Sequence, residues 1–128
     1  QLSREAYESR IKTHRSEYIT ERDFATIKSM GFNSVRIPVP YFIFGDCEPF
    51  IGCVKELDKA FAWADKYGLS ILIDLHTVPG SQNGFDNGGI SGICSWSQNP
   101  EYVAFTLNVL ERLAKRYGMR HELYESKF

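Results

Sequence analysis

Three junctions with one residue pattern constrain the fold of this 128-residue chain most strongly. Each has an apolar or aromatic residue, a glycine and another apolar residue: Met30-Gly31-Phe32, Tyr67-Gly68-Leu69 and Tyr117-Gly118-Met119. Glycine commonly ends a helix because it adopts a positive φ without strain. A recurring unit of helix, tight turn and strand predicts an α/β fold, in which parallel strands are joined by right-handed crossover helices.

The residues around these junctions predict the individual elements. Strands are expected near 33–37 and 69–75, the first ended by Pro38 and the second an almost unbroken apolar run, typical of a strand buried on both faces. Helices are expected over 3–13, 20–30, 54–67 and 100–117, with Ser3, Thr20 and Asn99 as caps. A further strand would begin near Arg120, where the chain ends within a few residues, so the sequence predicts a piece of a larger α/β repeat.

Composition excludes several function classes. The net charge of -1 gives no electrostatic argument for a nucleic-acid or membrane partner, and no apolar run approaches the length of a membrane span. Cys47, Cys53 and Cys94 form no closely spaced pair of the Cys-x-x-Cys kind, so neither a metal site nor a cofactor is expected. Three free thiols are favoured slightly over a bond that joins Cys47 to Cys53.

Two charged or titratable side chains stand where the predicted strands end. Arg36 could bind a carboxylate group of a site, or it could form an ion pair across the sheet end. His76, two residues after Asp74, could donate a hydrogen bond to a substrate hydroxyl, or its ring could be satisfied by neighbouring backbone. For both residues the position at a strand end favours the functional interpretation.

The stretch GSQNGFDNGG, at 80–89, has the composition of a polar binding loop. Asn83 and Asn87 carry amides suited to sugar hydroxyls, and Phe85 between them offers a flat apolar face suited to a pyranose. Tyr41 belongs to a second loop, rich in aromatic residues, and is a further candidate for stacking. The alternative is a turn-rich loop in which asparagine and aspartate side chains bond their own backbone.

Longer segments resemble one enzyme family. YITERDFATIKSMGFNSVRIPV and LDKAFAWADKYGLSILIDLHTVPGSQNGFDNGG are similar to glycoside hydrolase family five, in the branch that contains exo-β-1,3-glucanases. The resemblance covers about residues 14–124. It implies part of a (β/α)₈ barrel, or TIM barrel, whose active site lies at the carboxyl ends of the strands.

The resemblance also implies a chemistry. Family members are retaining hydrolases of β-linked glucans, with β-1,3-glucan favoured here, and use two glutamates about 5 Å apart. By the family pattern, Arg36 supports the region of the nucleophile, His76 bonds the sugar at the cleavage point, and Phe85 matches an aromatic residue at the entrance. The family's acid/base lies in an Asn-Glu-Pro motif, which is absent from this sequence, and the nucleophile comes from a later strand.

Residues 1–128 are therefore expected to be a single fragment of a barrel domain that lacks both catalytic glutamates. The expected partner is a β-glucan or an oligosaccharide. The alternatives are a non-catalytic carbohydrate-binding fragment and an inactive truncated product. Strand edges left open would favour self-association. The first ten residues lack the apolar core of a signal peptide, and the resemblance is compatible with an extracellular location.

Overall fold

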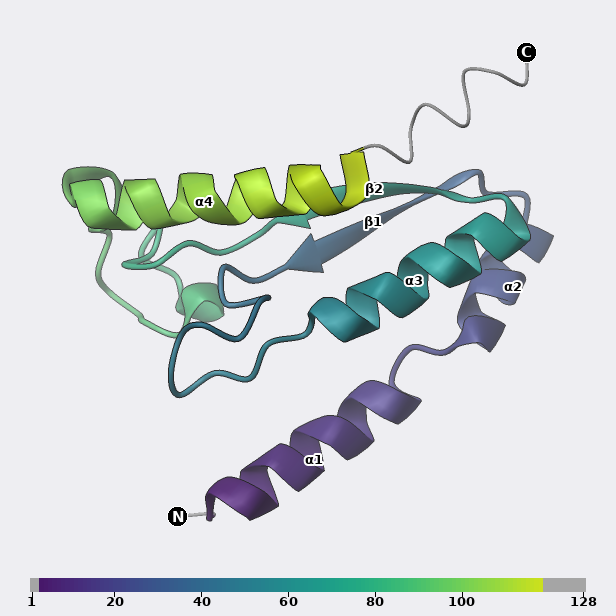
Figure 1. The fold of residues 1–128 in the computed structure, drawn as a ribbon, viewed down its shortest axis with the longest axis horizontal. Coiled ribbons are helices and arrows are strands. Elements are labelled where there is room, and N and C mark those ends of the chain that lie inside the picture. Colours follow the sequence, from purple (N-terminus) through teal and green to yellow (C-terminus); the bar gives the residue numbers. More distant parts are fainter. Residues whose placement is uncertain (1–2, 119–128) are drawn as a thin grey trace. The chain divides into compact units, whose positions relative to one another are not determined.

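The computed structural model describes residues 3–118, which form four α-helices, two β-strands and two short 3₁₀ helices (Figure 1). Their order is α1 (Arg4–Glu17), α2 (Glu21–Ser29), β1 (Ser34–Val39), α3 (Val54–Tyr67), β2 (Ser70–Leu75), η1 (Asp86–Gly88), η2 (Trp96–Gln98) and α4 (Pro100–Tyr117). Within the described residues two compact units are formed, one by residues 3–38 and 42–74 and the other by residues 39–41 and 75–118. The expected third strand, near Arg120, lies outside the described residues.

The two strands pair with each other, as the repeated unit of helix, turn and strand predicts. The backbone N–H of Ser70 donates to the Asn33 carbonyl, and that of His76 donates to the Val39 carbonyl, so the bonds at both ends of the pair join residues 37 apart. This number equals the spacing from Gly31 to Gly68. The partial α/β fold with parallel strands is thereby confirmed.

The expectation that Pro38 ends the first strand is wrong, because β1 continues to Val39. Along a strand, backbone groups point alternately to the two sides, and Asn33 and Val39 both point their carbonyls toward β2. Pro38, one residue before Val39, therefore directs its nitrogen away from β2. A proline is tolerated there because no N–H of that residue is needed to bond β2.

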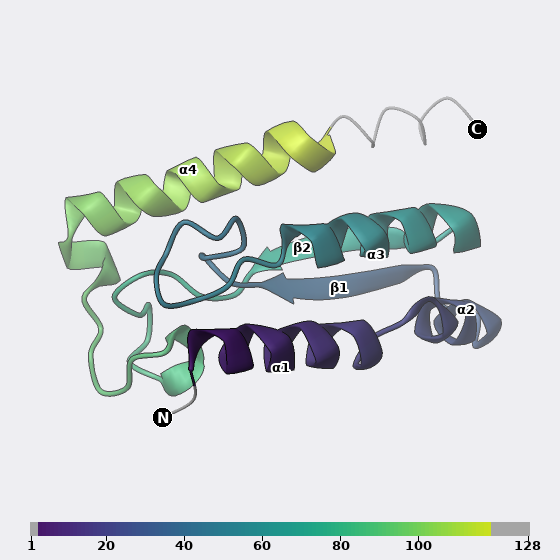
Figure 2. The same cartoon turned by 60° about the horizontal axis from the view of Figure 1, so that its bottom comes forward.

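One face of the strand pair carries the core of the first unit. Phe24 of α2, Ala60 and Ala64 of α3, and Leu69 are buried together, and Val35, Ile37 and Ile71 pack against them. Figures 1 and 2 show α3 running alongside the two strands. Alternation along the strands puts Arg36, Leu72 and Asp74 on the opposite face, where Leu72 is 63% exposed.

The helix ends of the first unit follow local sequence. The Ser3 hydroxyl accepts a hydrogen bond from the Ala6 N–H, as predicted for a cap, and α1 extends to Glu17 rather than ending near residue 13. Thr20 caps α2, and Gly68 ends α3 with a φ of 64°, in the left-handed region. These caps satisfy backbone groups that a helix leaves without partners.

The second unit consists of α4 and a long loop that precedes it. The Asn99 side chain accepts from the Glu101 N–H, which confirms the predicted start of α4. The loop is fastened to this helix, because the indole Nε1–H of Trp96 donates to the Thr106 hydroxyl at 2.9 Å. None of the helices in residues 3–118 is long and apolar enough to cross a membrane.

Acid should remove part of the stability of α2. The backbone N–H and the hydroxyl of Thr20 donate to the Asp23 carboxylate, which lowers the pKa of that group. A lowered pKa in the folded state stabilises the fold above about pH 4, and this contribution is lost as the pH falls through the folded pKa. We expect Asp23→Asn to lower Tm at neutral pH and to match the parent in strong acid.

Thermal unfolding of the two proteins, followed by circular dichroism across the acid range, measures this difference. Glu17→Gln, at an exposed position of α1, is the control and should show a difference in Tm that does not change with pH. A constant Tm difference between Asp23→Asn and the parent at every pH would contradict the claim that the ionised Asp23 carboxylate stabilises the fold.

Candidate functional site

Arg36 lies in the middle of β1, because the strand continues through Pro38 to Val39, and it pairs with Asp74 near the carboxyl end of β2. Its Nε and Nη2 atoms donate to the same carboxylate oxygen, Asp74 Oδ2, at 3.1 and 2.5 Å. The Arg36 side chain is more than half exposed, whereas that of Asp74 is largely covered. The ion pair across the sheet end, one of the two alternatives for Arg36, is therefore present, and the exposed edge of the guanidinium remains accessible to an anionic or hydroxyl-bearing group.

His76 follows β2 directly and belongs to the second unit. Its backbone N–H donates to Val39, and its backbone carbonyl accepts from the side-chain Nε2 of Gln82 at 3.0 Å. The residue is exposed. The backbone of His76 is thus fixed on both sides by hydrogen bonds, and its imidazole stands at the end of the strand.

The amide-rich loop is built on its own hydrogen bonds. The Asn83 side chain accepts from the Phe85 N–H at 3.1 Å, and the Ser81 hydroxyl accepts from the Gly84 N–H at 2.9 Å. Asn83, Phe85 and Asn87 are all exposed, and the ring of Phe85 is 68% exposed. The alternative in which asparagine bonds its own backbone therefore holds for Asn83, while Phe85 presents its ring outward.

The start of this loop is shaped by close packing. Gly80 has a φ of 74°, and a Cβ atom there would lie 2.6 Å from the ring of Tyr102. Its carbonyl accepts from both the backbone N–H and the hydroxyl of Ser95. A glycine is required at this position, so the loop leaves the strand in one defined direction.

Tyr41 is placed differently from the other candidate residues. It is buried, its ring meets that of Phe105 edge-on with 6.4 Å between centroids, and its N–H donates to the Thr77 hydroxyl. The structure thus brings Asn83, Phe85 and Asn87 into one loop of the second unit, with His76 tied to that loop. Arg36 belongs to the first unit.

The thiols are free, and burial raises the pKa of Cys47 and of Cys53. Cys94 is exposed, and its Sγ donates to the Gln82 carbonyl. Across residues 3–118 there is no group of three histidine, cysteine, aspartate or glutamate side chains arranged to hold a metal ion.

Two contacts of this region were not expected from sequence. The Asp74 carboxylate binds Arg36. Gln82 supports His76, and its Oε1 atom is buried without a hydrogen-bond partner in the described structure. Alternation along each strand gives a signal for the first, since it puts Arg36 and Asp74 on the face opposite Val35, Ile37 and Ile71. Gln82 carries no periodic signal.

Parallel strands, crossover helices and polar groups near the carboxyl ends of the strands define an α/β protein. The model of the family Cellulase (glycosyl hydrolase family 5) matches residues 4–124. The chain belongs to this family, which confirms the resemblance noted in the sequence.

Characterised relatives and solved structures agree with this assignment. The chain is 47% identical over 112 residues to "Glucan 1,3-beta-glucosidase 1" of Schizosaccharomyces pombe, covering 85% of this chain and 27% of that protein. It is 43% identical over 120 residues to "Glucan 1,3-beta-glucosidase" of Pichia angusta, covering 91% and 28%. The chain thus spans less than a third of the length of either relative.

Among solved structures, the rutinosidase from Aspergillus niger has a similar fold. The TM-score is 0.71 at 26% identity, and the similarity covers 78% of this chain and 29% of that one. The structure titled AoRut gives a TM-score of 0.72 at 30% identity, with the same coverage. The fold is therefore that of part of a family-five TIM barrel.

Proposed function

We propose that this chain is part of a retaining glycoside hydrolase that acts on β-linked glucans, with β-1,3-glucan as the favoured substrate. The observation that carries the proposal is family membership over residues 4–124, together with relatives named glucan 1,3-beta-glucosidase. Residues 1–128 would form one portion of a single barrel domain, and a β-glucan or an oligosaccharide would be the partner.

In this proposal the chain binds sugar and other residues of the polypeptide perform the chemistry. Retaining hydrolysis needs a glutamate that protonates the leaving oxygen and a second that attacks the anomeric carbon. No Asn-Glu-Pro sequence occurs in the 128 residues, so neither role is assigned here. His76, Phe85, Asn83 and Asn87 are proposed as sugar-binding residues. Tyr41 is not among them, because its ring is buried against Phe105.

Arg36 has a related role in the proposal. Its guanidinium pairs with Asp74, one residue before the carboxyl end of β2, and remains exposed. A cation at this edge would stabilise a carboxylate that is brought close to it, including the nucleophile. Self-association through open strand edges is a separate proposal.

His76→Ala should lower kcat/KM of the natural gene product on a soluble β-1,3-glucan by about 10- to 100-fold, because a hydrogen bond to the substrate is removed. Initial rates over a range of glucan concentrations give this ratio. His14→Ala is the matched control, since His14 stacks on Tyr18 within α1, and it should leave kcat/KM unchanged.

The outcomes separate the alternatives. Equal values of kcat/KM for His76→Ala and the parent would remove His76 from the site. A parent that binds the glucan in a calorimetric titration but releases no sugar would favour the non-catalytic binding fragment. A parent that does neither would favour an inactive product.

A further inference from the structure

Helix α1 fastens the loop between β1 and α3 through a guanidinium group. Arg15 Nη1 donates to the Gly52 carbonyl at 2.6 Å, and Nη2 donates to the Ile51 carbonyl at 2.7 Å. Both bonds are partly buried. The planar fork of arginine can hold two adjacent acceptors at once, and charge-assisted bonds of this kind are stronger than neutral ones.

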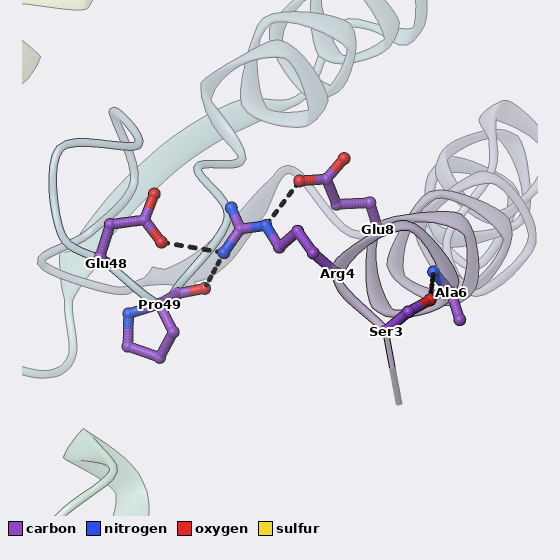
Figure 3. Close-up of polar contacts among 6 residues, drawn as sticks. All are labelled: Ser3, Arg4, Ala6, Glu8, Glu48 and Pro49. Atoms are coloured by element: carbon purple, nitrogen blue, oxygen red, sulfur yellow. Dashed lines mark hydrogen bonds and ion pairs between the residues drawn. The ribbon is translucent and has the colours of Figure 1, made fainter. Parts of the chain in front are cut away.

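A second arginine reaches the same loop two and three residues before Ile51. Arg4 Nη1 donates to the carboxylate of Glu48 at 2.9 Å and to the Pro49 carbonyl at 3.0 Å, while its Nε donates to Glu8 (Figure 3). These contacts are exposed, so they are weaker than those of Arg15. The carbonyls on both sides of Phe50, those of Pro49 and Ile51, are therefore held by arginines of α1.

Phe50 is half of an aromatic pair in this loop. Its ring stacks on that of Phe42, with 4.4 Å between centroids and 14° between planes. Phe42 lies three residues after the end of β1, so the pair stands beyond the carboxyl end of that strand. Both rings are half-buried, and each leaves some surface accessible.

The loop is closed at its base independently of the arginines. The N–H groups of Cys53 and Val54 both donate to the Ile43 carbonyl, at 2.8 and 3.0 Å. Ile43 itself is fully buried. The base of the loop is thus fixed by its own backbone. The arm that carries Phe50 is held by one backbone bond, from the Phe50 N–H to the Cys47 carbonyl at 2.9 Å, and by the contacts to α1.

We propose that Arg15 is a positioning residue that holds the β1–α3 loop so that the Phe42–Phe50 ring pair packs against the apolar face of a bound glucan sugar. This rests on the proposed function, which puts the substrate at the carboxyl ends of the strands. An aromatic surface matches the C–H face of a pyranose, and a fixed surface binds with less loss of conformational freedom than a mobile one.

Three variants of the natural gene product test this role on a soluble β-1,3-glucan. Arg15→Met removes both hydrogen bonds and should raise KM by about 10-fold with kcat within about 2-fold of the parent. Arg15→Lys keeps the charge but has a single donor nitrogen in place of the planar fork, so its KM should be intermediate. Arg10→Met, at an exposed residue of α1 without a hydrogen bond to the described residues, is the matched control and should match the parent.

A fourth variant links Arg15 to the rings. Phe50→Leu should raise KM as Arg15→Met does, and the double variant should be no worse than either single change, because both disturb one surface. An unchanged KM in Arg15→Met, or KM effects that multiply in the double variant, would overturn the proposal. A fall in kcat and Tm at constant KM would also overturn it, since this is the signature of partial unfolding.

Limited proteolysis by chymotrypsin reads the contact to α1 without reference to activity. Cleavage after Phe50 should be faster in Arg15→Met than in the parent. Addition of the glucan to the parent should make its cleavage slower than without the glucan. If cleavage depends on Arg15 but the parent neither binds nor hydrolyses the glucan, the proposed function fails and the sugar-positioning role with it. If the parent hydrolyses the glucan and cleavage is the same in both proteins, the positioning role alone fails.

Discussion

Gly52→Ala is expected to reduce the free energy of unfolding by about 3 kcal/mol, among the larger losses that one added methyl group produces. A Cβ atom at this position would lie 2.5 Å from the backbone nitrogen of Gly45 and 2.9 Å from the Ile43 carbonyl oxygen. These neighbours are main-chain atoms, so no side-chain rotation relieves the overlap. The main chain must shift, and the shift weakens the bonds that Cys53 and Val54 donate to Ile43.

Urea denaturation, followed by circular dichroism, measures this loss. Gly118→Ala is the control, because a Cβ there has no neighbour within 4 Å and the φ of Gly118 is -64°. Its free energy of unfolding should stay within about 0.5 kcal/mol of the parent. If Gly52→Ala also stayed within that range, the close approach of Gly52 to Gly45 and to the Ile43 carbonyl would be contradicted.

Ile43→Ala should have a comparable effect for a different reason. The Ile43 side chain is fully buried, and its removal loses apolar burial and leaves a cavity, at a cost of about 3 kcal/mol. The carbonyl that closes the loop remains in place. Ile43→Val removes a single methylene and should cost about 1 kcal/mol.

The graded series is measured by the same urea transitions. Ile93→Ala provides the reference for an exposed isoleucine, since Ile93 is 51% exposed, and should cost less than about 1 kcal/mol. Equal losses for Ile43→Ala and Ile93→Ala would show that Ile43 does not anchor the base of the loop.

Sequence predicted the parts of the fold that depend on periodic or local patterns. The spacing between Gly31 and Gly68 equals the spacing across the hydrogen bonds that join β1 to β2. The caps at Ser3 and Asn99 form the expected hydrogen bonds because a cap involves only residues two or three positions away. The prediction that Pro38 ends the first strand failed because the missing N–H of a proline disrupts a strand only when that position faces a partner strand.

The candidate site could be predicted only in part. His76 directly follows the end of β2, as expected, because that strand boundary could be estimated from sequence. Arg36 lies in the middle of β1 instead of at its end, because the strand continues to Val39. Tyr41 is buried against Phe105, a contact between residues far apart in sequence that no local pattern marks. The same holds for Arg15, whose partners lie 36 and 37 residues away in a loop without periodicity.

The central claim is that these residues belong to a retaining β-glucan hydrolase, and the configuration of the first sugar released tests it most directly. The natural gene product would be incubated with a soluble β-1,3-glucan, and the anomeric protons would be followed by NMR before mutarotation is complete. The proposed function predicts that sugar with the β configuration appears first. Release of the α anomer would contradict the retaining mechanism, and no release would contradict hydrolysis itself.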